Sequence, residues 1–142
     1  MEATKVLGTA EAQNTGNTYT TQLTIGNHTL IADEPKAVGG QEMGPTPGDY
    51  LCMSLASCKA ITLRMYAQRK QWEVGEIRIN VKLVKSDEEV AGLNTFYCTI
   101  HFTGNLSEEQ EKRLLEIAKK CPIDRLLQKP SAIETVIEQR RS

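Results

Sequence analysis

The sequence predicts an α+β fold, in which antiparallel strands and long helices form separate blocks of the chain. Residues 18–25 alternate apolar and polar side chains, which is the period of a half-buried strand. Residues 47–70 instead repeat apolar side chains at spacings of three and four, as an amphipathic helix does. The predicted order is β-β-β-α-β-β-α-α-β, with strands joined by hairpins, so we expect the sheets to be antiparallel.

The N-terminal part of the chain is predicted to contain three strands. Residues 4–12 form the first, and a turn-rich segment at residues 13–17 separates it from residues 18–25. Gly26-Asn27 then supplies a two-residue hairpin turn, because glycine adopts positive φ freely, and the chain continues into His28–Ala32. Residues 37–46 are rich in glycine and proline and are expected to form a loop.

A capping box predicts where the first long helix begins. Thr46 fits the N-cap, Pro47 the first helical position and Asp49 the third. The helix is expected to end near Lys70. Its buried stripe is expected to follow the three- and four-residue spacing of Leu51, Leu55, Cys58, Thr62 and Met65.

The C-terminal half begins with two strands of clean alternation. Residues 77–83 and residues 96–102 each place apolar side chains on one face, and residues 86–94 form an acidic turn region between them. Ser107 and Gln110 form a second capping-box signature that opens another helix, with Leu114 and Cys121 on its apolar face together with Ile117 or Ala118.

The last predicted elements are a short helix and a closing strand. Pro122 ends the preceding helix and can start a third one, with Cys121 at its N-cap. Beyond it, the spacing of Ile133, Thr135 and Ile137 suggests a strand.

Length and composition limit the classes of function. At 142 residues the chain is expected to form one domain, residues 1–142. A net charge of −1 and an aromatic content of 5% argue against nucleic-acid binding, and the apolar runs are too short to span a membrane. The N-terminus lacks the features of a signal peptide, and four cysteines without one indicate a reducing compartment. We therefore expect a cytoplasmic protein.

The cysteines do not have the spacing of a metal site. No Cys-x-x-Cys or His-x-x-x-His pattern surrounds His28 or His101, so we expect no bound metal. Cys98 lies on the apolar face of its strand, and Cys52 lies roughly 120° around the helix from Cys58. Both are expected to be packing residues.

Cys58 and Cys121 differ in local setting. An N-cap position is expected to lower the pKa of the Cys121 thiol, while Asp124 three residues later opposes that shift. Cys58, in mid-helix, gains no help from the helix dipole. Lys59 projects about 100° away from it, and Arg64 lies roughly 9 Å further along the axis. Each cysteine can be either a packing residue or a reactive thiol.

Two motifs carry a family resemblance. The first joins Gly39-Gly40, Gly44-Pro-Thr-Pro and Leu55-Ala-Ser-Cys58 and extends to Trp72; the second is Cys121-Pro-Ile followed by a β-prone tail. Together they resemble the OsmC/Ohr family of thiol-dependent peroxidases, and most closely its stand-alone OsmC-like branch. The resemblance covers roughly residues 35–137.

The resemblance implies an OsmC-like fold, with antiparallel sheets wrapped around long central helices in an intertwined homodimer. Carried over, Cys58 is the peroxidatic thiolate that attacks an organic (alkyl) hydroperoxide, and Cys121 is the resolving thiol. A thiol or dithiol reductant then restores the pair, without a metal or bound cofactor. An apolar pocket at the dimer interface favours alkyl hydroperoxides. The implied biology is an antioxidant, stress-response role.

One part of the family pattern is different here. In the family's peroxidases an arginine from the N-terminal region pairs with the reactive thiolate, held by a glutamate at the start of the first helix. The glutamate position corresponds to Gly48, and the adjacent Asp49 is the candidate for that role. No arginine precedes Arg64, so Arg113, Arg125 or a partner subunit's lysine would have to supply the cation. The alternative is a non-catalytic OsmC-like protein that binds a small ligand or senses redox state.

Overall fold

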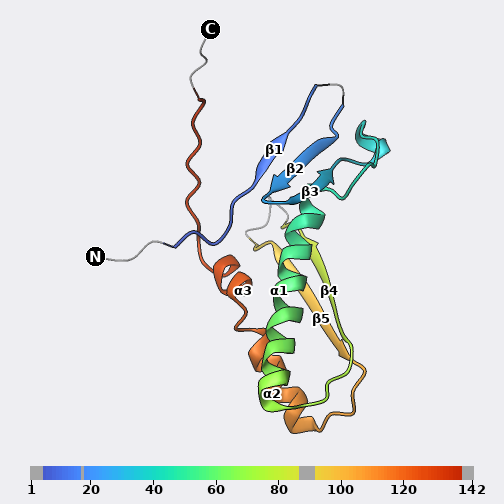
Figure 1. The fold of residues 1–142 in the computed structure, drawn as a ribbon, viewed down its shortest axis with the longest axis vertical. Coiled ribbons are helices and arrows are strands. Elements are labelled where there is room, and N and C mark those ends of the chain that lie inside the picture. The colour runs from blue at the N-terminus through green and yellow to red at the C-terminus, as the bar shows by residue number, and fades with distance from the viewer. Residues whose placement is uncertain (1–4, 17, 87–91, 139–142) are drawn as a thin grey trace, which may run out of the picture. The chain divides into compact units, whose positions relative to one another are not determined.

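The structure is a computed structural model that describes residues 5–16, 18–86 and 92–138 (Figure 1). It confirms the α+β class. In chain order the elements are β1 (Glu11–Gln13), β2 (Thr21–Ile25), β3 (His28–Ala32), the 3-10 helix η1 (Lys36–Val38), α1 (Pro47–Lys70), β4 (Ile77–Val84), β5 (Thr95–Phe102), α2 (Glu108–Ala118) and α3 (Pro122–Leu127). They divide into two compact units: residues 1–53 with 83–96, and residues 54–82 with 97–142.

The first unit contains an antiparallel sheet in the order β1-β2-β3. Its hairpin is the predicted one, since Gly26 adopts a φ of 55° in the turn between β2 and β3. The first strand is much shorter than the expected residues 4–12. Glu11 opposite Thr24 begins the ladder with β2, and residues 5–10 are exposed and not in a strand. Residue 4 lies outside the described residues. Alternation alone does not show where a partner strand ends.

A buried aspartate organises the loop that follows β3. The Asp33 side chain accepts hydrogen bonds from the Thr20 hydroxyl at 2.7 Å and from the backbone N–H of Glu34 at 2.7 Å, and also from the backbone N–H groups of Gln41 and Met43. The Thr20 hydrogen bond is the main cause that lowers the pKa of the Asp33 carboxyl, with burial opposing it and the backbone donors adding to it. Asp33 therefore holds the loop as an anion.

Glycines allow the same loop to lie directly against the backbone before it. A Cβ atom at Gly40 would collide with the carbonyl of Glu34, and one at Gly44 would collide with the carbonyl of Ile31. The Ile31 oxygen also accepts a 2.6 Å hydrogen bond from the hydroxyl of Tyr50, in the first turn of α1. Gly40 and Gly44, which both belong to the first family motif, thus have a packing role.

The second unit has its own apolar core, built from α1, α2 and the β4–β5 pair. In Figure 1, α1 runs alongside this pair. The strands are antiparallel, because the N–H of Thr103 after β5 donates to the Glu76 oxygen before β4. Their predicted alternation is confirmed, with half-buried and exposed residues taking turns. The fully or nearly buried core residues are Leu63, Tyr66, Ala67, Val74, Leu114 and Ala118.

The buried stripe of α1 matches the predicted one only in part: Leu55 is buried, and Cys58 and Thr62 are half-buried. The helix begins and ends where expected, and Thr46 and Asp49 form the reciprocal hydrogen bonds of the capping box. Its buried residues, however, are Leu55, Lys59, Leu63, Tyr66 and Ala67. Leu51 and Met65 of the expected stripe are 42% and 65% exposed. Apolar residues lie all around this helix, so periodicity alone could not select the buried face.

The strand predicted at the C-terminal end, around Ile133–Ile137, does not form in the single chain. Residues 131–138 form no strand, and Ile133, Val136 and Ile137 are each about nine-tenths exposed. Alternation was present in the sequence, but a strand also needs a neighbouring backbone to receive its hydrogen bonds. Nothing in the described part of the chain supplies one.

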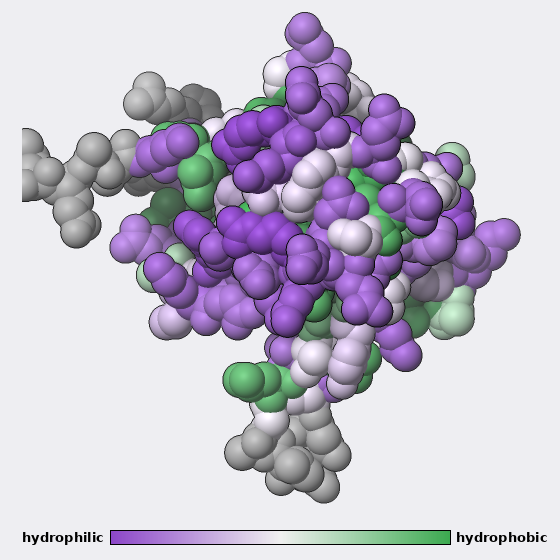
Figure 2. Space-filling model, turned by 90° about the horizontal axis from the view of Figure 1, so that it is seen from below, coloured by the Kyte–Doolittle hydropathy of each residue, from purple (hydrophilic) through white to green (hydrophobic). Residues whose placement is uncertain are grey.

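None of the described helices is both long and apolar enough to cross a membrane. The face drawn in Figure 2 is largely hydrophilic, and its apolar side chains form small separate patches. In the second unit, large apolar side chains are exposed mainly on the helices and the C-terminal residues, as in Ile61, Met65, Leu115 and Ile137.

Candidate functional site

The site is built on the second unit, where α1 presents two neighbouring residues, Cys58 and Lys59. Lys59 occupies a core-facing position, one turn from Leu55 and one turn from Leu63, and only 4% of it is exposed. Cys58 lies beside this stripe and is half-buried. A charged side chain inside an apolar stripe is costly unless it is paired, so its partners matter.

The ammonium group of Lys59 donates hydrogen bonds to two residues, one on each side of the turn between α2 and α3. Its Nζ donates to the backbone oxygen of Ala118 at 2.8 Å, and to Oδ2 of Asp124 at 2.6 Å. Ala118 ends α2, where carbonyl groups lack helical partners and carry the negative end of the helix dipole. Asp124 lies in the first turn of α3, and its other oxygen accepts a hydrogen bond from Gln128. The ammonium group therefore joins three helices.

Cys121 lies in this turn, between Ala118 and Asp124. The predicted N-cap position is confirmed: the Cys121 sulfur accepts the N–H of Asp124 at 3.4 Å, and Pro122 follows as the first helical residue. The cysteine is fully buried, with an exposed fraction of 0%. Its place on the apolar side of α2, shared with Leu114 and Ala118, was predicted from the sequence.

The fold brings Cys58 and Cys121 together. The Cys58 thiol lies close enough to act on the pKa of the Cys121 thiol as a side-chain hydrogen-bond partner, although the residues lie in different halves of the sequence. Burial is the main cause that raises the pKa of Cys121; the N–H of Asp124 lowers it, the Cys58 hydrogen bond raises it, and the charge of Lys59 lowers it. The prediction that the N-cap gives Cys121 a lowered pKa is therefore wrong, because burial outweighs the helix N-terminus.

Two adjacent thiols beside a buried cation are suited to thiol–disulfide chemistry. Oxidation of one sulfur to a sulfenic acid allows the other to condense with it, forming a disulfide and releasing water. The cation was missed by sequence reasoning. Lys59 was expected to point away from Cys58, and its charge acts instead on Cys121 across the turn. Its position in line with Leu55 and Leu63 was the available signal.

The family assignment rests on sequence as well as geometry. A family model described as OsmC-like protein matches residues 39–136, well over half of the chain. The chain belongs to the OsmC-like family. The match includes both motif cysteines, Cys58 and Cys121. No curated protein matches the sequence significantly.

Solved structures share the OsmC-like fold at low sequence identity. An OsmC-like protein from Mycoplasma pneumoniae has a TM-score of 0.67 at 21% identity, covering 88% of this chain and 89% of the other. An organic hydroperoxide resistance protein OsmC from Legionella pneumophila has a TM-score of 0.60 at 22% identity, over 87% and 91%. The organic hydroperoxide resistance protein OhrB of Bacillus subtilis has a TM-score of 0.60 at 21% identity, over 85% and 91%.

In this OsmC-like chain, Asp49 is held in the capping box at the start of α1. Its Oδ2 accepts the N–H of Thr46 at 3.0 Å, and its own N–H donates to the Thr46 hydroxyl at 3.1 Å. Asp49 belongs to the first compact unit, whereas Cys58, Lys59 and Cys121 belong to the second. Its structural role as a cap is therefore clear, and a catalytic role for it stays a prediction.

Arg113, one of the expected substitute cations, is exposed and engaged with other partners. Its Nε donates to the Tyr66 hydroxyl at 3.0 Å, and its guanidinium pairs with Glu116 at 2.9 Å. Both contacts raise the pKa of Arg113. Arg69 and Lys70 also lie within 6 Å of the Tyr66 ring centre. These cations surround a tyrosine, whereas the charge of Lys59 acts on Cys121.

A hollow of about 740 Å³ adjoins the cysteine-bearing segments. Thr62, one turn after Cys58 on α1, is part of its wall, and so is Lys120, directly before Cys121. The remaining walls are mainly apolar with one further cation: Met65, Tyr66, Gln68, Arg69 and Ile117. This hollow is large enough for an alkyl chain.

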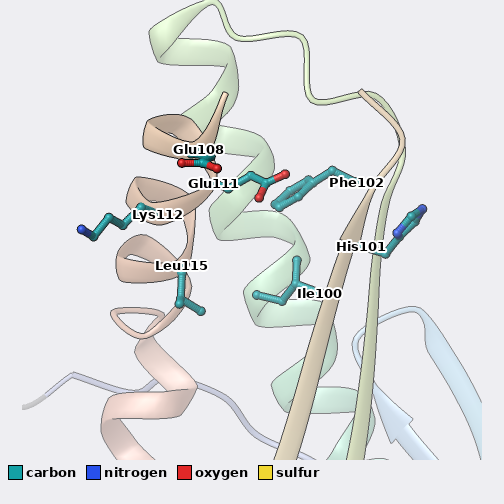
Figure 3. A pocket seen from close by; sticks show the side chains of 7 residues that line it. All are labelled: Ile100, His101, Phe102, Glu108, Glu111, Lys112 and Leu115. Atoms are coloured by element: carbon teal, nitrogen blue, oxygen red, sulfur yellow. The ribbon is translucent and has the colours of Figure 1, made fainter. Parts of the chain in front are cut away.

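A second hollow, of about 540 Å³, lies between β5 and α2, and neither hollow has a cysteine among its lining residues. Figure 3 shows Ile100 and Phe102 projecting from the strand toward the helix, with Glu111 at the opening, whereas His101 points away from them. Within the described residues, no group of three or more histidine, cysteine, aspartate or glutamate side chains is placed to hold a metal ion.

Proposed function

We propose that this protein is a thiol-dependent hydroperoxide reductase in which Cys58 and Cys121 form the redox pair. The observation that carries the proposal is that Cys58 and Cys121, the motif cysteines of an OsmC-like chain, are close enough for one thiol to act on the pKa of the other, with the Lys59–Asp124 ion pair beside them. The structural neighbours named for organic hydroperoxide resistance support the same substrate class.

In the proposed cycle, the Cys58 thiolate attacks the O–O bond of an alkyl hydroperoxide. One oxygen stays on sulfur as the sulfenic acid, and the other leaves with a proton as the alcohol. The Cys121 sulfur then displaces the hydroxyl of the sulfenic acid, forming the Cys58–Cys121 disulfide, and its proton leaves with the hydroxyl as water. An external dithiol returns both sulfurs to thiols and is itself oxidised to a disulfide. No bound metal or cofactor takes part.

The hollow lined by Thr62 and Lys120, which are near Cys58 and Cys121 in sequence, supports an alkyl substrate, since Met65 and Ile117 would gain from covering an apolar chain. We also propose that the active protein is a homodimer in the cytoplasm. Exposed apolar side chains on α1 and at the C-terminus favour an intertwined partner, and disulfides persist in oxidising compartments, so a pair that returns to thiols suits a reducing one. A folded monomer at micromolar concentration would contradict the dimer.

Intact-mass analysis with peptide mapping tests the reaction. Reduced protein receives one equivalent of an alkyl hydroperoxide, and samples are taken over time. We expect a rapid loss of two protons, localised to a Cys58–Cys121 disulfide. Cys58→Ser should abolish peroxide consumption, whereas Cys121→Ser should leave Cys58 open to over-oxidation, seen as a gain of two or three oxygens.

Cys52→Ser is the matched control, because Cys52 is another half-buried cysteine of α1. It should consume peroxide at the wild-type rate. Full activity in Cys58→Ser, or a disulfide that maps to other cysteines, would refute the assignment.

The second candidate function is a non-catalytic OsmC-like protein that binds a small ligand or senses redox state. It is favoured by the absence of arginine before Arg64 and by the raised pKa of Cys121, which lowers its thiolate fraction at neutral pH. Oxidation of the pair over minutes, without turnover by a dithiol, would support this candidate.

A further inference from the structure

Lys59 is difficult to explain as a stabilising residue. A buried ion pair replaced by apolar side chains of similar volume often leaves a protein equally stable or more stable. Leu55 and Leu63, one turn away on either side, show that this face of α1 otherwise contacts the core with leucine. A leucine or methionine at position 59 would extend that pattern without burying a charge. The lysine therefore calls for a role that needs charge.

The contacts of Lys59 bracket Cys121. Ala118, which accepts one hydrogen bond, lies three residues before the cysteine, and Asp124, which accepts the other, lies three residues after it. The same Asp124 also donates its backbone N–H to the Cys121 sulfur. Since Lys59 directly follows Cys58 in α1, one side chain fixes the turn carrying the second cysteine against the helix carrying the first.

The charged groups around Cys121 affect how readily its sulfur carries negative charge. The groups that face its sulfur are Cys58 and Lys59 from α1 and Asp124 from α3. Burial disfavours a thiolate at Cys121 and raises its pKa, and the backbone N–H of Asp124 and the positive charge of Lys59 both oppose that rise. Asp124 limits this effect, because its carboxylate is bound to the same ammonium group.

We propose that Lys59 is a positioning residue of the redox pair, which holds Cys121 against Cys58 and stabilises negative charge on the Cys121 sulfur as the disulfide forms and breaks. This inference rests on the proposed function, in which the two cysteines form a disulfide. When Cys121 attacks, and when it leaves during reduction by a dithiol, the sulfur passes through a thiolate-like state that a nearby cation favours.

The test measures disulfide formation with diamide, a general thiol oxidant, so that it does not depend on peroxide. Diamide accepts two electrons and two protons from the two thiols and becomes a hydrazine. The rate of Cys58–Cys121 disulfide formation is followed by mass spectrometry across a range of pH. The variants are Lys59→Met, Lys59→Arg and Asp124→Asn. The matched control is Lys112→Met, which removes an exposed lysine on α2.

Electrostatic positioning predicts shifts of opposite sign. Lys59→Met should slow the reaction at neutral pH at least tenfold and move its pH profile upward. Asp124→Asn, which leaves the cation without its counter-charge, should move the profile downward. Lys59→Arg should stay within about threefold of wild type, because it keeps the positive charge. Lys112→Met should match wild type.

A purely structural role gives a different pattern. The double variant Lys59→Met/Asp124→Leu replaces the ion pair by apolar side chains, and it keeps the test valid if Lys59→Met does not fold. Recovery of the wild-type pH profile in the double variant would overturn the proposal, as would shifts of the same sign in Lys59→Met and Asp124→Asn. If peroxide leaves the wild-type thiols unmodified while the diamide profiles behave as expected, the proposed function fails and the role of Lys59 stands.

Discussion

Replacing Gly44 with alanine should destabilise the protein through a clash between two backbone segments. The added Cβ would lie 2.7 Å from the carbonyl carbon of Ile31 and still closer to its oxygen. A carbonyl cannot rotate out of the way as a long side chain can, so the loop itself has to shift. Over-packing of this kind typically costs about 1–3 kcal/mol.

Two hydrogen bonds depend on the same geometry. The Ile31 oxygen accepts the Tyr50 hydroxyl at 2.6 Å, and the N–H of Asp33 donates to the Pro45 oxygen at 3.0 Å, next to the substituted residue. Losing one of these hydrogen bonds would destabilise the fold by about a further 1 kcal/mol. Gly44→Ala should therefore lower the free energy of unfolding by about 2–4 kcal/mol.

Gly48→Ala is the matched control, since it makes the same chemical change four residues further along. The nearest atom to its added Cβ is the Thr46 hydroxyl oxygen at 3.8 Å, an ordinary contact. Gly48 lies in the first turn of α1, where alanine favours the helix by up to about 1 kcal/mol. This variant should be as stable as wild type or slightly more stable.

Urea unfolding followed by circular dichroism measures both variants at one fixed protein concentration, because association would otherwise shift the midpoint. Hydrogen exchange of the Asp33 amide reports on the loop itself. Equal midpoints for Gly44→Ala and Gly48→Ala would refute the reasoning, because they would show that the loop moves away from Ile31 without cost.

Two further predictions concern the buried aspartate and the core. The lowered pKa of Asp33 means that its contribution to stability is present above the ordinary carboxyl pKa of about 3.9 and is lost as pH falls through the lower, folded-state pKa. Asp33→Asn should lack this part of the acid sensitivity, and urea midpoints measured from pH 7 to pH 3 test this; identical pH dependence in the variant would contradict it. Leu63→Ala removes a fully buried side chain from the second unit and should cost about 2–5 kcal/mol. The control Lys112→Met should stay within about 0.5 kcal/mol of wild type in the same unfolding experiment.

Local patterns in the sequence predicted local structure well. The Gly26 hairpin and the β4–β5 alternation depend on neighbouring residues only, and the structure confirms both. The same is true of the two capping boxes: Ser107 accepts the N–H of Gln110, while the Gln110 side chain accepts the N–H of Ser107.

The predictions that failed concern features that depend on residues distant in the sequence. The strand expected around Ile133–Ile137 requires a second backbone beside it, and the described chain provides none. The family resemblance was needed to pair Cys58 with Cys121, because no local spacing relates them. The ion pair between Lys59 and Asp124 depends on the position of α3 against α1, which local sequence patterns do not indicate.

The cap that Cys121 makes for α3 affects what each round of oxidation would demand of the backbone. Its sulfur receives the N–H of Asp124 through a lone pair, and a thiol, a thiolate and a disulfide sulfur all carry lone pairs. The first turn of α3 can therefore stay wound while the sulfur changes its bonding partner. A redox cycle built on this cap would need little reorganisation of the chain between turnovers, so its speed would depend on chemistry and substrate entry rather than on refolding of a helix.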